Sequence, residues 1–319
     1  MSRARIDILE PGLMTSVQDA GRWGHQRFGV PVCGVRDQIA RRFANTLVGN
    51  RPNTALLEAN MLGPRFKVLD APTLVAIAGS DQAKLMVGDV AVPPLQSVVV
   101  YPGEEVSVTP WGDSACVSIA FGGGVDVPLV LGSASTYMRG GFGGFQGRKL
   151  ETGDQLTLGP TTDHTERWCQ QPLPYGDGPL PIVLGPQHDH FPQETLATLT
   201  QGDYVVTNDC DRMGTRFDGQ PLSHVGDFNI VSDAMAAGSV QIPGGKTPII
   251  MGPDRGTVGG YTKIGTIATV AMSRFGRLKP RDRVRFVITS AHEALADLRA
   301  KEADIRRMLM WVQAHKARP

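Results

Sequence analysis

Residues 147–158 read GRKLETGDQLTL and resemble residues 276–286, which read GRLKPRDRVRF. Each stretch predicts a turn that leads through an aspartate into a β-strand, and each closes one half of the chain. Between them, residues 171–181 read QPLPYGDGPLP and have the proline and glycine content of a linker. The repeat therefore predicts two related halves that are rich in β-strand.

The glycine and proline content agrees with this division. Among its 319 residues the chain has 38 glycines, about 12%, and 23 prolines, about 7%. Average usage is about 7% for glycine and 5% for proline. Because both residues interrupt helices, this composition favours short strands joined by tight turns over a helical bundle or a regular βαβ repeat. Runs rich in β-branched or aromatic residues and bounded by Gly, Pro or Asp predict strands at 73–78, 97–101, 116–120, 155–158, 204–207 and 283–288.

Helices are expected at three places. Residues 37–48 carry apolar side chains at helical spacing, and a weaker pattern covers residues 192–200. At the C-terminus, Ser290 and Glu293 form a capping-box pattern before an apolar stripe, which can pack on its own domain or on a partner. We therefore expect a mostly β protein with few helices. Its expected parts are an N-terminal half at 1–175, a C-terminal half at 176–289 and a C-terminal helix at 290–319.

Charge and cysteine usage exclude several classes of protein. The chain has 32 Lys and Arg against 31 Asp and Glu, which argues against a nucleic-acid partner. No apolar run approaches the roughly 18 residues of a membrane span, and the charged N-terminus lacks the apolar region of a signal peptide. The 4 cysteines are scattered and form no C-x-x-C pair, which indicates a reducing compartment. These features predict a cytoplasmic protein.

The chain lacks the familiar catalytic and nucleotide-binding motifs. A phosphate-binding loop that ends in Gly245-Lys-Thr would need a glycine where the chain has Val240. Neither the G-x-G-x-x-G fingerprint nor the G-x-S-x-G elbow occurs. His188 and His190 resemble half of a metal site, but no further ligand follows at a recognisable spacing. No metal is therefore expected.

Polar residues in Gly- and Pro-rich loops are the remaining candidates for a functional site. Loops on a rigid β scaffold often carry binding and catalytic residues. In the alternative interpretation, such residues only cap turns and pair with one another. The candidates are Gln18, Asp19, Arg22, Asp37, Gln187, Asp189, Asp211, Arg212, Gln241, Asp254, Tyr261 and Lys263.

Several of these loops carry motifs of a known family. They include PGLMTSVQDAGR at 11–22, ANTLVGN at 44–50, GPQ at 185–187, DRMG at 211–214 and GSVQIPG at 238–244. In this order, over residues 6–286, the sequence resembles the allophanate hydrolase subunit 2 family. This biotin-dependent carboxyltransferase-like family includes the C-subunit of 5-oxoprolinase and urea amidolyase-related proteins. The chain departs from the family's usual residues at Cys33, Arg36, Gly256, Val258 and Thr262.

The resemblance implies two cyclophilin-like β-barrel units and a partner of the subunit 1 family, like the B-subunit of 5-oxoprolinase. The preferred function is that of a subunit of an ATP-dependent amide hydrolase that opens 5-oxoproline to glutamate. One alternative is the carboxyltransferase half of a urea carboxylase-like enzyme, which moves a carboxyl group from carboxybiotin to urea. Another is a non-catalytic regulator that binds a subunit 1 partner.

The resemblance also implies where the cofactors come from. The chain has no Met-Lys-Met biotin site and no ATP-binding motif, so partner subunits would supply ATP or carboxybiotin, among them a lactam-utilisation protein or a biotin carboxylase. An amide-directed site needs donors for the carbonyl oxygen and a base near N–H. Matched to the motifs, the expected catalytic residues are Asp211, Arg212, Asp254, Tyr261 and Lys263. The expected substrate-binding residues are Gln18, Asp19, Arg22, Asp37, Gln187, Asp189 and Gln241.

Overall fold

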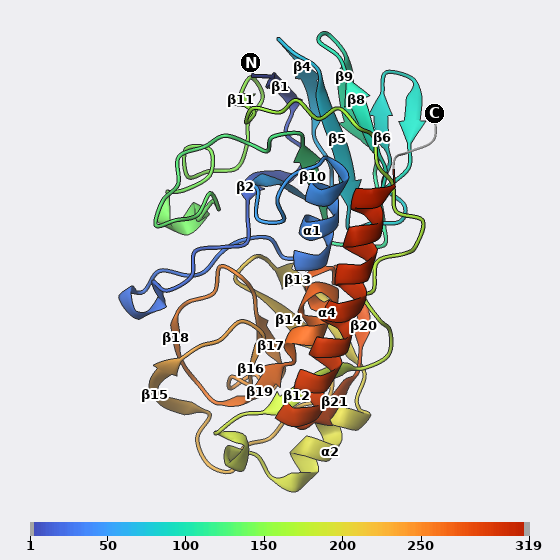
Figure 1. The fold of residues 1–319 in the computed structure, drawn as a ribbon. Coiled ribbons are helices and arrows are strands. Elements are labelled where there is room, and N and C mark those ends of the chain that lie inside the picture. The colour runs from blue at the N-terminus through green and yellow to red at the C-terminus, as the bar shows by residue number, and fades with distance from the viewer. Residues whose placement is uncertain (1–2, 316–319) are drawn as a thin grey trace. The chain divides into compact units, whose positions relative to one another are not determined.

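The computed structural model describes residues 3–315 and shows a mostly β protein with few helices, as the sequence predicts (Figure 1). The chain forms two compact units. Of the described residues, unit 1 contains 3–22, 33–174 and 304–315, and unit 2 contains 23–32 and 175–303. The division differs from the expected one in two respects. Residues 23–32 group with the second unit, and the C-terminal helix is divided between the units after Ala303.

Unit 1 is built from two antiparallel sheets around one apolar core. Its strands are β1 (Arg5–Glu10), β2 (Met14–Gln18), β3 (Leu56–Asn60), β4 (Arg65–Val68), β5 (Thr73–Ala78), β6 (Leu85–Val87), β7 (Val90–Val92), β8 (Ser97–Val100), β9 (Glu105–Val108), β10 (Cys116–Phe121) and β11 (Gln155–Thr157). One sheet has the order β11-β1-β4-β9-β6-β7 and the other β2-β3-β10-β5-β8. In β1 and β4 buried and more exposed side chains alternate, whereas β5 and β10 are buried throughout. Helix α1 (Gln38–Leu47) contacts β5 and β10 and covers them.

Unit 2 contains a sheet of eight strands with a nearly closed order. Its elements are β12 (Leu180–Leu184), α2 (Gln193–Gln201), β13 (Tyr204–Cys210), β14 (Gly214–Asp218), β15 (Asn229–Ala234), β16 (Ser239–Gln241), β17 (Ile249–Met251), β18 (Val258–Tyr261), β19 (Lys263–Ile267), α3 (Met272–Gly276), β20 (Arg283–Val284) and β21 (Phe286–Thr289). The order is β20-β13-β14-β17-β16-β19-β12-β21, so the two edge strands follow each other directly in the sequence. Strands β15 and β18 form a separate two-stranded ribbon. Short 3-10 turns lie at Gln26–Phe28, Met138–Gly140, His188–His190 and Thr269–Ala271.

The predicted strand at 283–288 is divided in two. Val284 pairs with Tyr204 of β13, while Phe286–Thr289 pair in parallel with β12. The chain therefore changes partners at Arg285, which brings the two edges of the sheet together and nearly closes a barrel. An apolar pattern alone does not show which strand each residue will pair with.

Helix α4 (Ala291–Ala314) begins at the predicted capping box. Ser290 Oγ accepts a hydrogen bond from Glu293 N at 3.1 Å, and Glu293 Oε2 accepts one from Ser290 N at 2.9 Å. The boundary between the units falls inside this helix, after Ala303. In the unit 1 half, Ile305, Leu309 and Val312 are buried. Within the described residues, none of the helices is long and apolar enough to span a membrane.

The repeat seen in the sequence is a repeat of local structure. In the first copy Asp154 Oδ2 accepts from Glu151 N, and Asp154 O accepts from Ile8 N at 2.9 Å. In the second copy Asp282 makes the equivalent bonds to Lys279 N and Val206 N. The residue before each aspartate is left-handed, Gly153 at φ 88° and Arg281 at φ 75°. Each copy thus anchors a turn to a neighbouring strand of its own unit.

Candidate functional site

Four polar residues of unit 2 converge beside the ribbon, and we call them the Lys263 cluster: Gln187, Asp233, Gln241 and Lys263. Gln241 of β16 and Lys263 of β19 are register partners on adjacent strands. Gln187 follows β12, which pairs with β19 on its other side. Asp233 comes from β15 in the ribbon. The barrel and the ribbon therefore both contribute side chains to one place.

Gln187 connects the parts of the Lys263 cluster. Its Oε1 accepts a hydrogen bond from Lys263 N at 3.0 Å, and its Nε2 donates to Asp233 Oδ2 at 3.0 Å. The same Asp233 oxygen lies 3.1 Å from Lys263 Nζ, which makes an ion pair. Lys263 thereby holds the pKa of Asp233 below its usual value, with help from the hydrogen bond of Ala234 N. The carboxylate is ionised at neutral pH.

The cluster contains buried hydrogen-bonding groups that lack a partner. Gln241 Nε2 has none among the described residues, and Lys263 Nζ has only the ion pair. The two residues are 5% and 6% exposed. Burying a polar group without a hydrogen bond costs about 1–3 kcal/mol, so such groups usually await a ligand or water. Together they offer donors suited to a carbonyl oxygen or a carboxylate.

Aromatic and apolar side chains border the cluster. Tyr261 is 40% exposed, and its ring centroid lies 6.2 Å from that of Phe228. A Cβ atom at Gly259 would lie 2.6 Å from Gln241 Nε2 and 2.9 Å from Met235 Cε. A larger residue at position 259 would therefore push the ends of the Gln241 and Met235 side chains aside. The result is a small polar site next to an apolar surface.

Three expected catalytic residues make structural contacts instead of joining this cluster. Arg212 donates from Nε and Nη2 to Asp254 at 2.9 and 2.8 Å, and both residues are buried. Asp211 Oδ1 accepts from Met213 N at 2.7 Å and Gly214 N at 3.1 Å, which closes the turn before β14. The expected binding residue Asp189 is exposed in the turn His188–His190.

In unit 1, Asp19 and Arg22 organise one loop. Asp19 accepts hydrogen bonds from Gly21 N and Ala134 N, both at 2.8 Å, and from the hydroxyls of Ser133 and Ser135. Arg22 Nη2 donates to Ser135 O, and its guanidinium lies 5.0 Å from the centroid of the Phe142 ring. These bonds join residues far apart in the sequence, so both side chains hold the loop in place.

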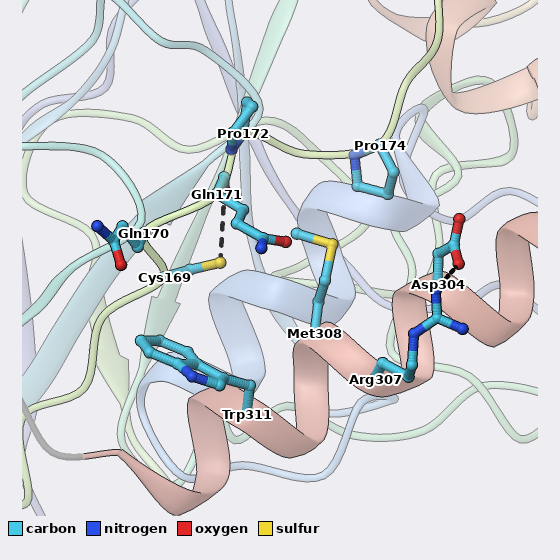
Figure 2. A pocket seen from close by; sticks show the side chains of 9 residues that line it. All are labelled: Cys169, Gln170, Gln171, Pro172, Pro174, Asp304, Arg307, Met308 and Trp311. Atoms are coloured by element: carbon cyan, nitrogen blue, oxygen red, sulfur yellow. Dashed lines mark hydrogen bonds and ion pairs between the residues drawn. The ribbon is translucent and has the colours of Figure 1, made fainter.

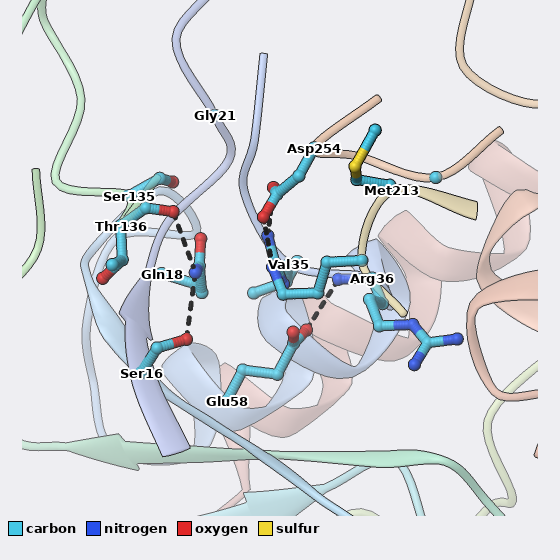
Figure 3. A network of polar contacts seen from close by, with 12 residues as sticks. Ser16, Gln18, Gly21, Val35, Arg36, Glu58, Ser135, Thr136, Met213 and Asp254 are labelled. Atoms are coloured by element: carbon cyan, nitrogen blue, oxygen red, sulfur yellow. Dashed lines mark hydrogen bonds and ion pairs between the residues drawn. The ribbon is translucent and has the colours of Figure 1, made fainter. Parts of the chain in front are cut away.

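Gln18 and Asp37 lie near Glu58, a buried acid that was not among the expected site residues. Gln18 Nε2 donates to Ser16 Oγ at 3.0 Å, whereas its buried Oε1 has no partner within residues 3–315 (Figure 3). Asp37 Oδ1 caps α1 by accepting from Ile39 N and Ala40 N, each at 3.0 Å. Glu58 is 0% exposed on β3 and accepts from Arg36 N at 2.6 Å. Glu58 lies inside an apolar strand, so no loop signal marks it.

Asp233 is another residue that sequence patterns do not mark. It lies in the middle of a strand in the stretch NIVSDA, without the Gly or Pro neighbours that marked the other candidates. Only the pairing of β15 with β18 brings it to Gln187 and Lys263. No motif in the sequence around Asp233 predicts this contact.

A recess of about 600 Å³ lies elsewhere in unit 1 (Figure 2). It is lined by residues of 169–174 and by the last turns of α4, including Arg307, Met308 and Trp311. It contains none of the expected site residues. Within the described part of the chain, no group of three or more His, Cys, Asp or Glu is placed to hold a metal ion.

Comparison with known proteins shows the family. Residues 28–288 match the model of the carboxyltransferase domain, subdomains A and B. The chain belongs to this family. It is 31% identical to the C-subunit of 5-oxoprolinase from Escherichia coli over 292 residues, which cover 91% of this chain and 93% of that protein. It is 29% identical to urea amidolyase of Saccharomyces cerevisiae over 304 residues, which cover 88% of this chain but 16% of that protein.

The fold is shared with a solved structure of the same family. The crystal structure of the K. lactis urea amidolyase matches with a TM-score of 0.86 and 25% identity, over 95% of this chain and 20% of that one. The relatives are thus either a component of 5-oxoprolinase or one part of a much longer urea amidolyase. The family membership supports the role of an enzyme subunit.

Proposed function

We propose that this chain is a subunit of a 5-oxoprolinase-like enzyme that opens the lactam of 5-oxoproline to glutamate. The observation that carries the proposal is the set of buried donors without hydrogen-bond partners in the Lys263 cluster. The match to the 5-oxoprolinase C-subunit over nearly the full length of both chains supports the same function. Matches to urea amidolyase cover a small part of that protein.

In this proposal the cluster binds the lactam through its polar edges. Gln241 Nε2 donates to the carbonyl oxygen, where negative charge develops when the carbonyl is attacked. Lys263 Nζ donates to another acceptor oxygen of the substrate. The ring carbons face the apolar side formed by Met235, Phe228 and Tyr261. The cluster therefore positions the amide and stabilises charge on its oxygen.

We assign the ATP chemistry to partner subunits. Lys263 is the one cation of the cluster, and Asp233 lies beside it. An anion in that place does not fit a triphosphate, which requires several cations or a row of backbone N–H groups. ATP bound by a partner would supply the driving force for ring opening. The partners in this proposal are a subunit 1 family protein and a lactam-utilisation protein.

The proposal is tested by an assay of ATP-dependent glutamate release from 5-oxoproline with the complete assembly. Gln241→Met is the informative variant, because Gln241 Nε2 has no partner whose loss would weaken the fold. We expect it to fold normally and to lose at least about tenfold in kcat/KM, the effect of one lost hydrogen bond to developing charge. Lys263→Met should lose more.

Lys149→Met is the matched control, since Lys149 is exposed in unit 1 and outside the cluster. It should leave glutamate release unchanged. Full activity of a folded Gln241→Met assembly would remove the cluster from the reaction.

The second candidate function is urea carboxylation, which the structural match to urea amidolyase favours. Carboxylation of urea by an assembly that contains biotin carboxylase, without glutamate release, would select it.

A further inference from the structure

The ribbon formed by β15 and β18 is largely exposed. Val231 and Val258 are 93% and 59% exposed. Its base is fixed, because Met235 packs with Ile249 and Met251 and its carbonyl accepts a hydrogen bond from Arg255 Nε at 3.0 Å. At the other end Tyr261 continues through Thr262 into β19, and Thr262 N donates to Phe228 O at 3.0 Å. The ribbon is thus held at both ends and exposed along most of its length.

Asp233 links the exposed part of the ribbon to the barrel. Its side chain is 47% exposed, yet Oδ2 is held by both Gln187 Nε2 and Lys263 Nζ. A carboxylate that receives an ammonium group and an amide N–H is bound as a free carboxylate ligand would be. Asp233 is the one anion of a cluster whose other open groups are donors. The site is therefore built to hold an anionic group.

We infer that Gln187 and Lys263 form the subsite for the carboxylate of the substrate, and that Asp233 occupies this subsite until the substrate displaces it. The inference rests on the proposed function and names the substrate class as an amide that carries a carboxylate. Displacement would release only the Asp233 contact, because Met235 and Thr262 hold the two ends of the ribbon. A neutral amide could not compete with Asp233 for Lys263, so the subsite would select against it.

The test compares an anionic lactam with a neutral one. We would measure binding of 5-oxoproline and of 2-pyrrolidinone to the full chain by calorimetry, for the wild type and for Asp233→Asn and Asp233→Ala. Loss of a half-exposed competing ion pair should tighten 5-oxoproline binding about two- to fivefold. Binding of 2-pyrrolidinone should not change. Asp218→Asn, which removes an exposed carboxylate from β14 of the same unit, is the control and should alter neither.

A second readout follows Asp233 directly. With 5-oxoproline bound, Asp233 loses the contact that lowers its pKa, so carbon-detected NMR should show that pKa rising toward its usual range. Unchanged or weaker 5-oxoproline binding in both Asp233 variants would overturn the inference. An equal gain in 2-pyrrolidinone affinity in these variants would also overturn it. So would the absence of 5-oxoproline binding to every variant at concentrations on the order of 10 mM. Glutamate release by the assembly is scored separately, so its failure would reject the proposed function without deciding the subsite.

Discussion

Arg212 and Asp254 form a buried ion pair with two parallel hydrogen bonds. A change of Asp254 to Asn removes the charged carboxylate that accepts both hydrogen bonds from the buried guanidinium. We expect the free energy of unfolding, measured by urea denaturation, to fall by about 3–5 kcal/mol. Any loss of activity should then follow the loss of folded protein.

The control for this change is Asp203→Asn, which breaks an exposed ion pair with Arg285 in the same unit. It should leave the unfolding curve almost unchanged. If Asp254→Asn is as stable as the wild type but inactive, Asp254 acts in the reaction and the structural role is wrong.

Tyr204 carries a buried hydroxyl for which the described residues provide no partner. Its ring packs against Phe286 at 5.3 Å between centroids. Tyr204→Phe keeps that packing and removes the unsatisfied group, so the free energy of unfolding at pH 7 should rise by about 1 kcal/mol. A less stable variant would show that a water molecule satisfies the hydroxyl.

The same residue gives a pH dependence with a defined sign. Burial raises the pKa of Tyr204 to about 12 from its ordinary value of 10.0. The folded state therefore favours the protonated phenol over the phenolate. The stability that this preference gives is fully present below pH 10 and is lost as the pH rises toward 12. Over that range the wild type should lose on the order of 1–2 kcal/mol more than Tyr204→Phe. If the free energies of unfolding of the wild type and of Tyr204→Phe changed in parallel over this pH range, the raised pKa of Tyr204 would be contradicted.

The candidate residues show what sequence reasoning can reach. Gln187, Gln241 and Lys263 were named from loops and motifs, and the structure brings them together. Asp211, Arg212 and Asp254 have the same residue types in the same kind of loop, but they close a turn and form a pair. Asp233 could be identified as part of the cluster only from the pairing of β15 with β18. Residue type marks polar candidates, whereas tertiary contacts decide which of them have free groups.

The repeated turns allow a matched test on two elements. Gly153 and Arg281 occupy equivalent left-handed positions, at φ 88° and φ 75°. A Cβ at Gly153 meets no atom within 4 Å, so its effect is purely conformational. Gly153→Ala should lower the free energy of unfolding by about 1 kcal/mol, and Arg281→Gly should leave it unchanged or raise it by up to about 1 kcal/mol. Equal losses in both variants would show that the turns are not equivalent.

Helices and strands were both predicted closely where local signals mark them, and the predicted strand at 73–78 coincides with β5. The helix predicted at 37–48 is α1 at Gln38–Leu47, and Asp37 is its capping residue. The capping box of Ser290 and Glu293 begins α4 as predicted. Strand pairing has no such local mark. The change of partner at Arg285 and the short helix α3 were therefore not predicted.

The division into two units follows the repeat in the sequence only in part. The linker prediction at 171–181 includes the junction at Pro174–Tyr175. Residues 23–32 and the two halves of α4 cross between units because packing, and not chain order, determines which core a segment joins. The composition predicted the fold class correctly, whereas the assignment of these segments required the structure.

We propose that the chain serves an enzyme acting on a carboxylate-bearing amide. The most direct test is ATP-dependent product formation by the complete assembly, with 5-oxoproline and urea as parallel substrates. We expect glutamate release from 5-oxoproline that depends on Gln241 and Lys263, and no turnover of urea. An assembly that is well folded and complete but releases no glutamate, or that carboxylates urea, would contradict it.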